Sequence, residues 1–235
     1  MPITENQKEK RRKYLGSSDA PAIAGVNPWQ TAADVYFDKI MPPSGNGKPP
    51  AENDAILVGK FCESAVLSWF EKETGLKLRR NQRRVHGNGI MAANLDALVG
   101  GSPVIVEAKT AGIITPFNRD EWGMIETDEV PERVIVQVHH QMAVMGEEYR
   151  TAWVPVLLGG IGFRKYRIDR NDQLIEQLVG LEINFWNEYV LKRTPPPDSL
   201  PSLEVLKRIQ RQPNKIVPVS NDLVLEWQDA SNLEK

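Results

Sequence analysis

The sequence predicts an α/β or α+β domain built on a mixed β-sheet. Helical periodicity near both ends of the chain, strand-like runs between them and short turns that pair those runs as hairpins favour this class. The chain has 235 residues, 41% of them hydrophobic, which is enough to bury a core without disulfides. We assign residues 1–198 to a single domain and residues 199–235 to a C-terminal extension suited to a partner or subunit contact.

Composition excludes several protein classes. The single cysteine, Cys62, excludes a disulfide framework, a four-cysteine zinc site and an iron–sulfur cluster held by this chain alone. No apolar run approaches about 18 residues, and the charged first residues lack the apolar stretch of a secretory signal, so we expect a cytoplasmic protein without a membrane span. The net charge of −2 argues against coating nucleic acid by bulk charge, but it allows a local basic groove.

Each expected helix follows from a local pattern. Ser18 or Asp19 can cap a short helix that ends by residue 24, and Thr31 can cap a second helix that reaches about residue 40. The clearest helix spans residues 54–74, and further helices are expected over 132–145 and about 171–193. The apolar residues of the 54–74 helix predict one buried stripe, formed by Val58, Phe61, Cys62, Ala65, Val66, Trp69 and Phe70.

The expected strands fall into two groups. Residues 77–110 contain strand-like runs around a turn at residues 100–103, and a long loop follows over 111–130. A second hairpin joins strands at about 151–158 and 162–168. Together with the helices, these hairpins predict a mixed sheet flanked by helices.

The first hairpin gathers charged residues. With the turn at residues 100–103, residue 99 faces residue 104, and the same antiparallel register places Asp96 opposite Glu107. Lys109 lies two residues after Glu107 and therefore on the same face of the strand. The register predicts two carboxylates and one ammonium on a shared surface.

Two interpretations of this cluster remain open from the residues alone. Lys109 can neutralise the two carboxylates as an ordinary surface network. Alternatively, a divalent cation lies between Asp96 and Glu107, with the Ala108 carbonyl as a further ligand. Oxygen ligands suit Mg²⁺ or Mn²⁺, and Lys109 would then orient or deprotonate a water molecule for attack on a phosphoryl group.

Other polar residues have both a functional and a structural interpretation. Glu63 borders the apolar stripe of its helix, either as a third metal-site acid or as an edge carboxylate paired with a base. Gln137 and Gln141 share one helix face and can bind the hydrolytic water or simply stabilise the core margin. Arg11 and Ser18 flank a glycine turn that can bind a phosphate, or they are a basic terminus and a helix cap.

Four sequence blocks carry a family resemblance. They are RRKYLGSSDAPAIAGVNPW at 11–29, GKFCESAVLSWFEKETG at 59–75, ANLDALVGGSPVIVEAKT at 93–110 and VIVQVHHQMAVMG at 134–146. In order and spacing they resemble the YqaJ-like viral recombinase family, relatives of the lambda-type phage exonuclease within the PD-(D/E)xK nuclease superfamily. The likeness covers about residues 11–198.

The resemblance implies an α/β, restriction-endonuclease-like core with a central mixed sheet flanked by helices. It also implies hydrolysis of double-stranded DNA from a 5′ end with Mg²⁺ or Mn²⁺. The residue roles that it implies are metal binding for Asp96, Glu107 and Glu63, catalysis for Lys109 and Gln141 or Gln137, and 5′-phosphate binding for Arg11 and Ser18. The Ala108 carbonyl proposed above would add a further metal ligand.

Three further expectations come with the resemblance. The resemblance allows a homo-trimer ring around DNA and a single-strand annealing protein as partner. It also places the expected protein in the cytoplasm of a bacterial host cell. The family also leaves alternative functions open. They are an endonuclease on the same fold and a non-catalytic DNA-binding protein.

Overall fold

The structure is a computed structural model that describes residues 11–41, 54–114, 119–197 and 199. The expected extension over 199–235 therefore lies outside the described residues, apart from Ser199. Within the described part of the chain, no helix combines the length and the apolar content that crossing a membrane requires.

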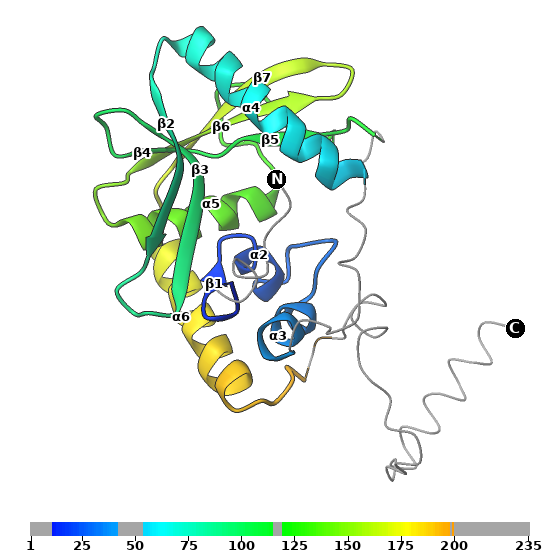
Figure 1. Cartoon of the computed structure of the whole chain (residues 1–235), viewed down its shortest axis with the longest axis vertical. Helices are drawn as coiled ribbons and strands as arrows, with labels where there is room; N and C mark the ends of the chain where they lie inside the picture. Colours follow the sequence, from blue (N-terminus) through cyan, green and yellow to red (C-terminus); the bar gives the residue numbers. More distant parts are fainter. Residues whose placement is uncertain (1–10, 42–53, 115–118, 198, 200–235) are drawn as a thin grey trace, which may run out of the picture.

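Helices and strands follow one another in a mixed order (Figure 1). The helices are α2 (Ala20–Ile23), α3 (Ala32–Ile40), α4 (Asp54–Thr74), α5 (Glu132–Met145), α6 (Asp172–Phe185) and the π-helix η1 (Trp186–Leu191). The strands are β1 (Leu15–Gly16), β2 (Leu78–Val85), β3 (Met91–Val99), β4 (Val104–Val106), β5 (Lys109–Ala111), β6 (Thr151–Leu158) and β7 (Gly162–Asp169). The strands form one seven-stranded mixed sheet, which confirms the predicted class.

Two long strands organise the sheet. β3 pairs with β2 along one edge, and with β4 (antiparallel) and β1 (parallel) along the other. β6 pairs with β7 along one edge, and β4 and β5 lie one after the other along its opposite edge, both parallel to it. After β4 the chain stops pairing with β3, and β5 pairs with β6. This departure creates a fork in the sheet.

Helices cover both faces of the sheet (Figure 1). On one face, Leu67 and Phe70 of α4 pack with Val106 of β4. On the other face, residues of α5 such as Met142 pack with Ile105 and the rest of the largest core cluster. Apolar side chains therefore alternate along β4 between two cores, as expected for a strand buried on both faces.

The predicted stripe of α4 is partly wrong. Val66 and Phe70 are buried as expected, but Ala65 is exposed and the Phe61 side chain is 81% exposed, while Leu67, outside the predicted stripe, is buried. Its buried residues all lie in the second half of the helix. The first half instead borders a pocket. Helical periodicity therefore predicted buried side chains there, although the sheet does not cover this part of the helix.

Helix ends and short strands show smaller differences. Thr31 caps α3 as predicted, and Asp34 completes a capping box. Asp19 is the N-cap residue of α2 but makes no side-chain cap hydrogen bond. The expected 171–193 helix changes from α to π geometry at Trp186. Leu15, expected near a turn, begins a short parallel strand.

A buried ion pair joins α5, α6 and β3. His140 Nδ1 lies 2.8 Å from Glu182 Oε1, both side chains are 0% exposed, and His140 Nε2 lies 3.1 Å from the Ala92 carbonyl oxygen. Burial lowers the pKa of His140, but Glu182, the Ala92 carbonyl and Asp19 outweigh it, so the pKa is raised above its ordinary value. Because both ring nitrogens face oxygen acceptors, the imidazolium is the form that satisfies both contacts.

This pair predicts a pH-dependent stability. A group whose pKa is raised on folding stabilises the fold below its unfolded pKa, about 6.5 for His, and loses this contribution as pH rises through the folded pKa. We expect His140→Gln to lower the free energy of unfolding by about 3–5 kcal/mol in mildly acidic solution. The difference between the wild type and the variant should shrink as pH rises. Denaturant unfolding over a pH series measures it, and a pH-independent difference would contradict the assignment.

Candidate active site

The predicted hairpin register is confirmed at the fork. Ala97 pairs with Val106 and Leu98 with Ile105, so the next step of the register places Asp96 opposite Glu107. Regular pairing ends there. The Glu107 N–H donates to the Trp153 carbonyl of β6 (3.0 Å), and the Ala108 N–H donates to the Asp96 carboxylate (2.8 Å). The Asp96 side chain thus replaces a backbone partner and holds the two diverging strands together.

The backbone is irregular beside Asp96. Leu95 and Leu98 pack in the same core cluster although they lie three residues apart, so the alternation of the strand changes phase between them. On the neighbouring strand β2, Asn81 lies between the partners of Ala97 and Leu95 and has φ 57°. Such conformations are costly outside glycine and gather at functional sites. The irregularity therefore coincides with Asp96, the residue that the register places opposite Glu107.

A hydrogen-bond network fixes Glu107. Lys109 Nζ lies 2.6 Å from Glu107 Oε1 and donates to Gln137 Oε1 at 2.9 Å. The Gln137 amide donates to the same Glu107 oxygen (2.6 Å), and the Gln141 amide donates to Glu107 Oε2 (2.7 Å). Both glutamines predicted from the spacing on α5 therefore contact one carboxylate. Gln141 Oε1 is buried with no hydrogen-bond partner in the described part of the chain.

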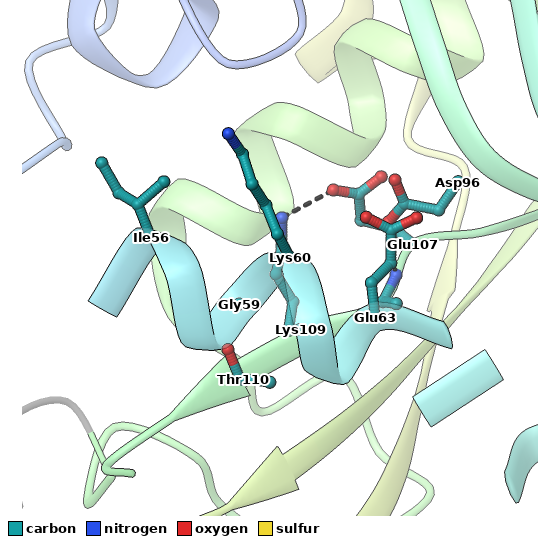
Figure 2. Close-up of a pocket in the computed structure, with 9 residues that line it drawn as sticks. Ile56, Gly59, Lys60, Glu63, Asp96, Glu107, Lys109 and Thr110 are labelled. Carbon is teal, nitrogen blue, oxygen red and sulfur yellow. Dashed lines mark hydrogen bonds and ion pairs between the residues drawn. The ribbon is translucent and has the colours of Figure 1, made fainter. Parts of the chain in front are cut away.

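Glu63 joins this group across a pocket of about 310 Å³. Figure 2 shows Glu63 on α4 pointing toward Asp96 and Glu107, with a dashed line joining the Lys109 amine to Glu107. Lys60, one turn before Glu63, also lines the pocket. The structure thus brings together the four charged residues proposed from the sequence. They come from α4, from strands β3 and β5, and from the link between β4 and β5.

The crowding of acids changes the pKa of Asp96. Burial of its carboxyl group and the negative charge of Glu107 raise the pKa of Asp96 well above its ordinary value, and Glu63 adds to this. Lys109 and the Ala108 N–H act in the opposite direction without cancelling it. A nearby positive charge would favour the carboxylate form, so the site is electrostatically suited to a cation.

The donor chemistry of the pocket fits Mg²⁺ or Mn²⁺. Three carboxylates and the Ala108 residue line it, and hard divalent cations prefer such oxygen ligands. Within the described ranges, no three His, Cys, Asp or Glu side chains already surround one metal-sized point. Glu107 is instead engaged by Lys109 and two amides. A cation would therefore share Glu107 with these groups or displace them.

A second group of predicted residues lies in the N-terminal segment. Arg11 donates to the Ser18 hydroxyl (3.2 Å), which brings the two proposed phosphate-binding side chains together on an exposed surface. Beneath them, Lys39 of α3 contacts Asp19 Oδ2 (2.6 Å) and the Arg11 carbonyl (3.1 Å), and Asp19 also accepts the Gly16 N–H (2.8 Å). The Lys39 and Asp19 side chains are only 5% and 10% exposed, so this ion pair fixes the turn from below.

Sequence reasoning missed two of these residues. Lys60 lies three positions before Glu63, a spacing that puts two residues on one helix face and could have indicated its place in the pocket. No pattern in the neighbouring residues indicated the role of Lys39, because its contacts with Asp19 and Arg11 join segments 20 and 28 residues apart.

Comparison with known proteins identifies relatives. The YqaJ-like viral recombinase domain matches residues 8–148. The YqaJ protein of Bacillus subtilis strain 168 is 38% identical over 188 residues, which cover 77% of this chain and 55% of that protein. The chain therefore spans about half the length of this curated relative.

Solved structures share the fold at low sequence identity. LHK-Exo, an alkaline exonuclease of Laribacter hongkongensis solved in complex with dAMP, matches with a TM-score of 0.63 and 19% identity, over 87% of this chain and 97% of that chain. A phage-related exonuclease from Haemophilus somnus matches with a TM-score of 0.54 and 15% identity, over 77% and 96% of the two chains. At these identities the likeness establishes the fold. With the matched domain and the 38% identical relative, it follows that the chain belongs to the YqaJ-like viral recombinase domain family.

Proposed function

We propose that this chain is a metal-dependent exonuclease that degrades double-stranded DNA in the 5′→3′ direction. The observation that carries the proposal is the pocket lined by Glu63, Asp96 and Glu107, in which the amine of Lys109 contacts Glu107. Membership of a viral recombinase family supports a DNA substrate. So does the fold shared with LHK-Exo, whose bound dAMP is the kind of mononucleotide that an exonuclease releases.

The carboxylates of Asp96, Glu107 and Glu63, with the Ala108 carbonyl, would hold the cation. A bound Mg²⁺ or Mn²⁺ supplies positive charge for the phosphate oxygens and acidifies water. Lys109 lies beside these acids and holds or deprotonates the attacking water. Gln137 positions the Lys109 amine through its 2.9 Å contact, and Gln141 holds the other oxygen of Glu107.

The reaction is hydrolysis of one phosphodiester bond. The water oxygen forms a bond to the scissile phosphorus, and the bond from phosphorus to the 3′-oxygen of the terminal nucleotide breaks. The leaving 3′-oxygen takes up a proton. The products are a 5′-mononucleotide and a strand that again carries a 5′-phosphate. Arg11 and Ser18, which are in contact, can bind each new 5′-phosphate in turn through charge-assisted hydrogen bonds.

Two other functions use the same fold. An endonuclease would cut closed circular DNA, and a non-catalytic protein would bind DNA without cutting it. The arrangement of Arg11 and Ser18 favours action at a strand end. A trimeric ring and an annealing protein as partner are proposals carried by the family resemblance. A contact role for residues 199–235 is a separate proposal, because the resemblance covers only about residues 11–198.

Loss of the amine or of the central acid should abolish activity. We expect Lys109→Met and Asp96→Asn each to lower the rate of Mg²⁺-dependent digestion of linear duplex DNA by roughly 10²–10⁴-fold, because each removes a group that acts in proton transfer or metal binding. Release of acid-soluble nucleotides measures the rate. Lys192→Met is the matched control, since this exposed lysine pairs with Glu188 elsewhere. Full activity of either site variant, with Mg²⁺ present, would refute the assignment. Equal digestion of closed circular DNA would favour the endonuclease.

The chemistry of the DNA end should matter. A duplex with 5′-phosphates should be digested faster than one with 5′-hydroxyls, and Arg11→Ala or Ser18→Ala should bring the ratio of the two rates toward one. Each lost charge-assisted hydrogen bond corresponds to a roughly 10-fold change. Arg150→Ala controls for loss of general positive charge, because Arg150 is exposed and pairs with Asp172. A wild-type ratio of one removes this role from Arg11 and Ser18.

A further inference from the structure

A second, larger pocket adjoins the catalytic one. It has a volume of about 550 Å³ and shares Lys109, Thr110 and Ile56 with the catalytic pocket. Ser18 also lines it, so a single space touches both the proposed 5′-phosphate site and the catalytic amine. This volume lies within the range of small-molecule sites, about 300–1,000 Å³.

The walls of this pocket are mostly apolar. Pro21 of α2, Val58 of α4, Val134 of α5 and Ile114 after β5 contribute to it. Polar groups in its wall include Ser18 of the proposed 5′-phosphate site, and Lys109 with its neighbour Gln137 beside the proposed scissile phosphate. An apolar space with a hydroxyl for one phosphate and an amine for the next has the chemistry of a nucleoside site.

A cation–aromatic stack forms part of the wall. The guanidinium carbon of Arg133 lies 4.8 Å from the centre of the Trp29 ring, and both residues line the pocket. Arg133 also pairs with Glu121, which fixes the guanidinium. The backbone N–H of Trp29 donates to Asn27 Oδ1 (3.0 Å), which fixes the loop. Trp29 is nevertheless 58% exposed, so part of this large aromatic residue stays open to a ligand.

We propose that this pocket binds the nucleobase of the 5′-terminal nucleotide, with Trp29 and Arg133 as its stacking surface. The inference rests on the proposed function, because Ser18 and Lys109 mark the two phosphates between which the terminal nucleoside lies. Nucleobases stack on indole rings and on guanidinium planes. Stacking needs no particular base, so all four bases are accepted. The base holds the scissile phosphate beside Lys109.

The test separates base binding from catalysis. Binding of dAMP and of deoxyribose 5-phosphate to the full chain is measured by calorimetry without metal. Wild type should bind dAMP about 5- to 100-fold more tightly, the factor expected for stacking of one base. Trp29→Ala should lose this difference and Trp29→Tyr should keep much of it. Because Trp29 is largely exposed, Trp29→Ala should retain the wild-type melting temperature.

A substrate experiment gives an independent readout. Wild type should digest a 5′-phosphorylated duplex whose terminal residue is abasic more slowly than a normal duplex, and Trp29→Ala should digest the two at equal rates. Equal binding of both small ligands by wild type overturns the base site, as does full discrimination by Trp29→Ala. If wild type discriminates between the small ligands but cuts no DNA, the nuclease proposal fails and the base site stands.

Discussion

The structure depends on one electrostatic constraint, the burial of Asp96 beside Glu107 and within reach of Glu63. Burial and these two acids raise the pKa of Asp96 despite the opposing effect of Lys109. Such crowding costs folding free energy, and a fold keeps it only where surrounding contacts hold it in place. Here the contacts are the Ala108 N–H on Asp96 and the two α5 amides on Glu107.

The fork in the sheet explains how side chains of one short hairpin can lie close to residues of two helices, α4 and α5. Because β4 ends at Val106 and β5 continues along β6, the side chains at the fork are open to Glu63 of α4 and to Gln137 of α5. The same opening leads to the larger pocket lined by Ser18 and Trp29. The proposed catalytic acids, the proposed phosphate-binding Ser18 and the proposed base site thus line two adjoining pockets. The buried His140–Glu182 and Lys39–Asp19 pairs fix the elements that enclose them.

Turn position and helical spacing predicted those parts of this site that depend on residues close together in the sequence. The turn at residues 100–103 fixes the register, so Asp96 falls opposite Glu107, and helical spacing puts Gln137 and Gln141 on one face. These rules failed where packing between distant segments determines which side chains are buried and which partners they have. Phe61 belongs to an apolar period but lies beyond the sheet core, and Asp19 pairs with Lys39 instead of capping its helix. Neither outcome has a signal in the neighbouring residues.

The central claim is that these acids form a site for a divalent cation, and thermal unfolding tests it without any DNA. Titration with MgCl₂ or MnCl₂ at constant ionic strength should raise the melting temperature of the wild type, with a stabilisation of about 2.7 kcal/mol at a cation concentration 100 times the dissociation constant. Asp96→Asn should lose this response and Lys192→Met should keep it. A wild type that responds to neither salt, or an Asp96→Asn variant that responds equally, would contradict the claim.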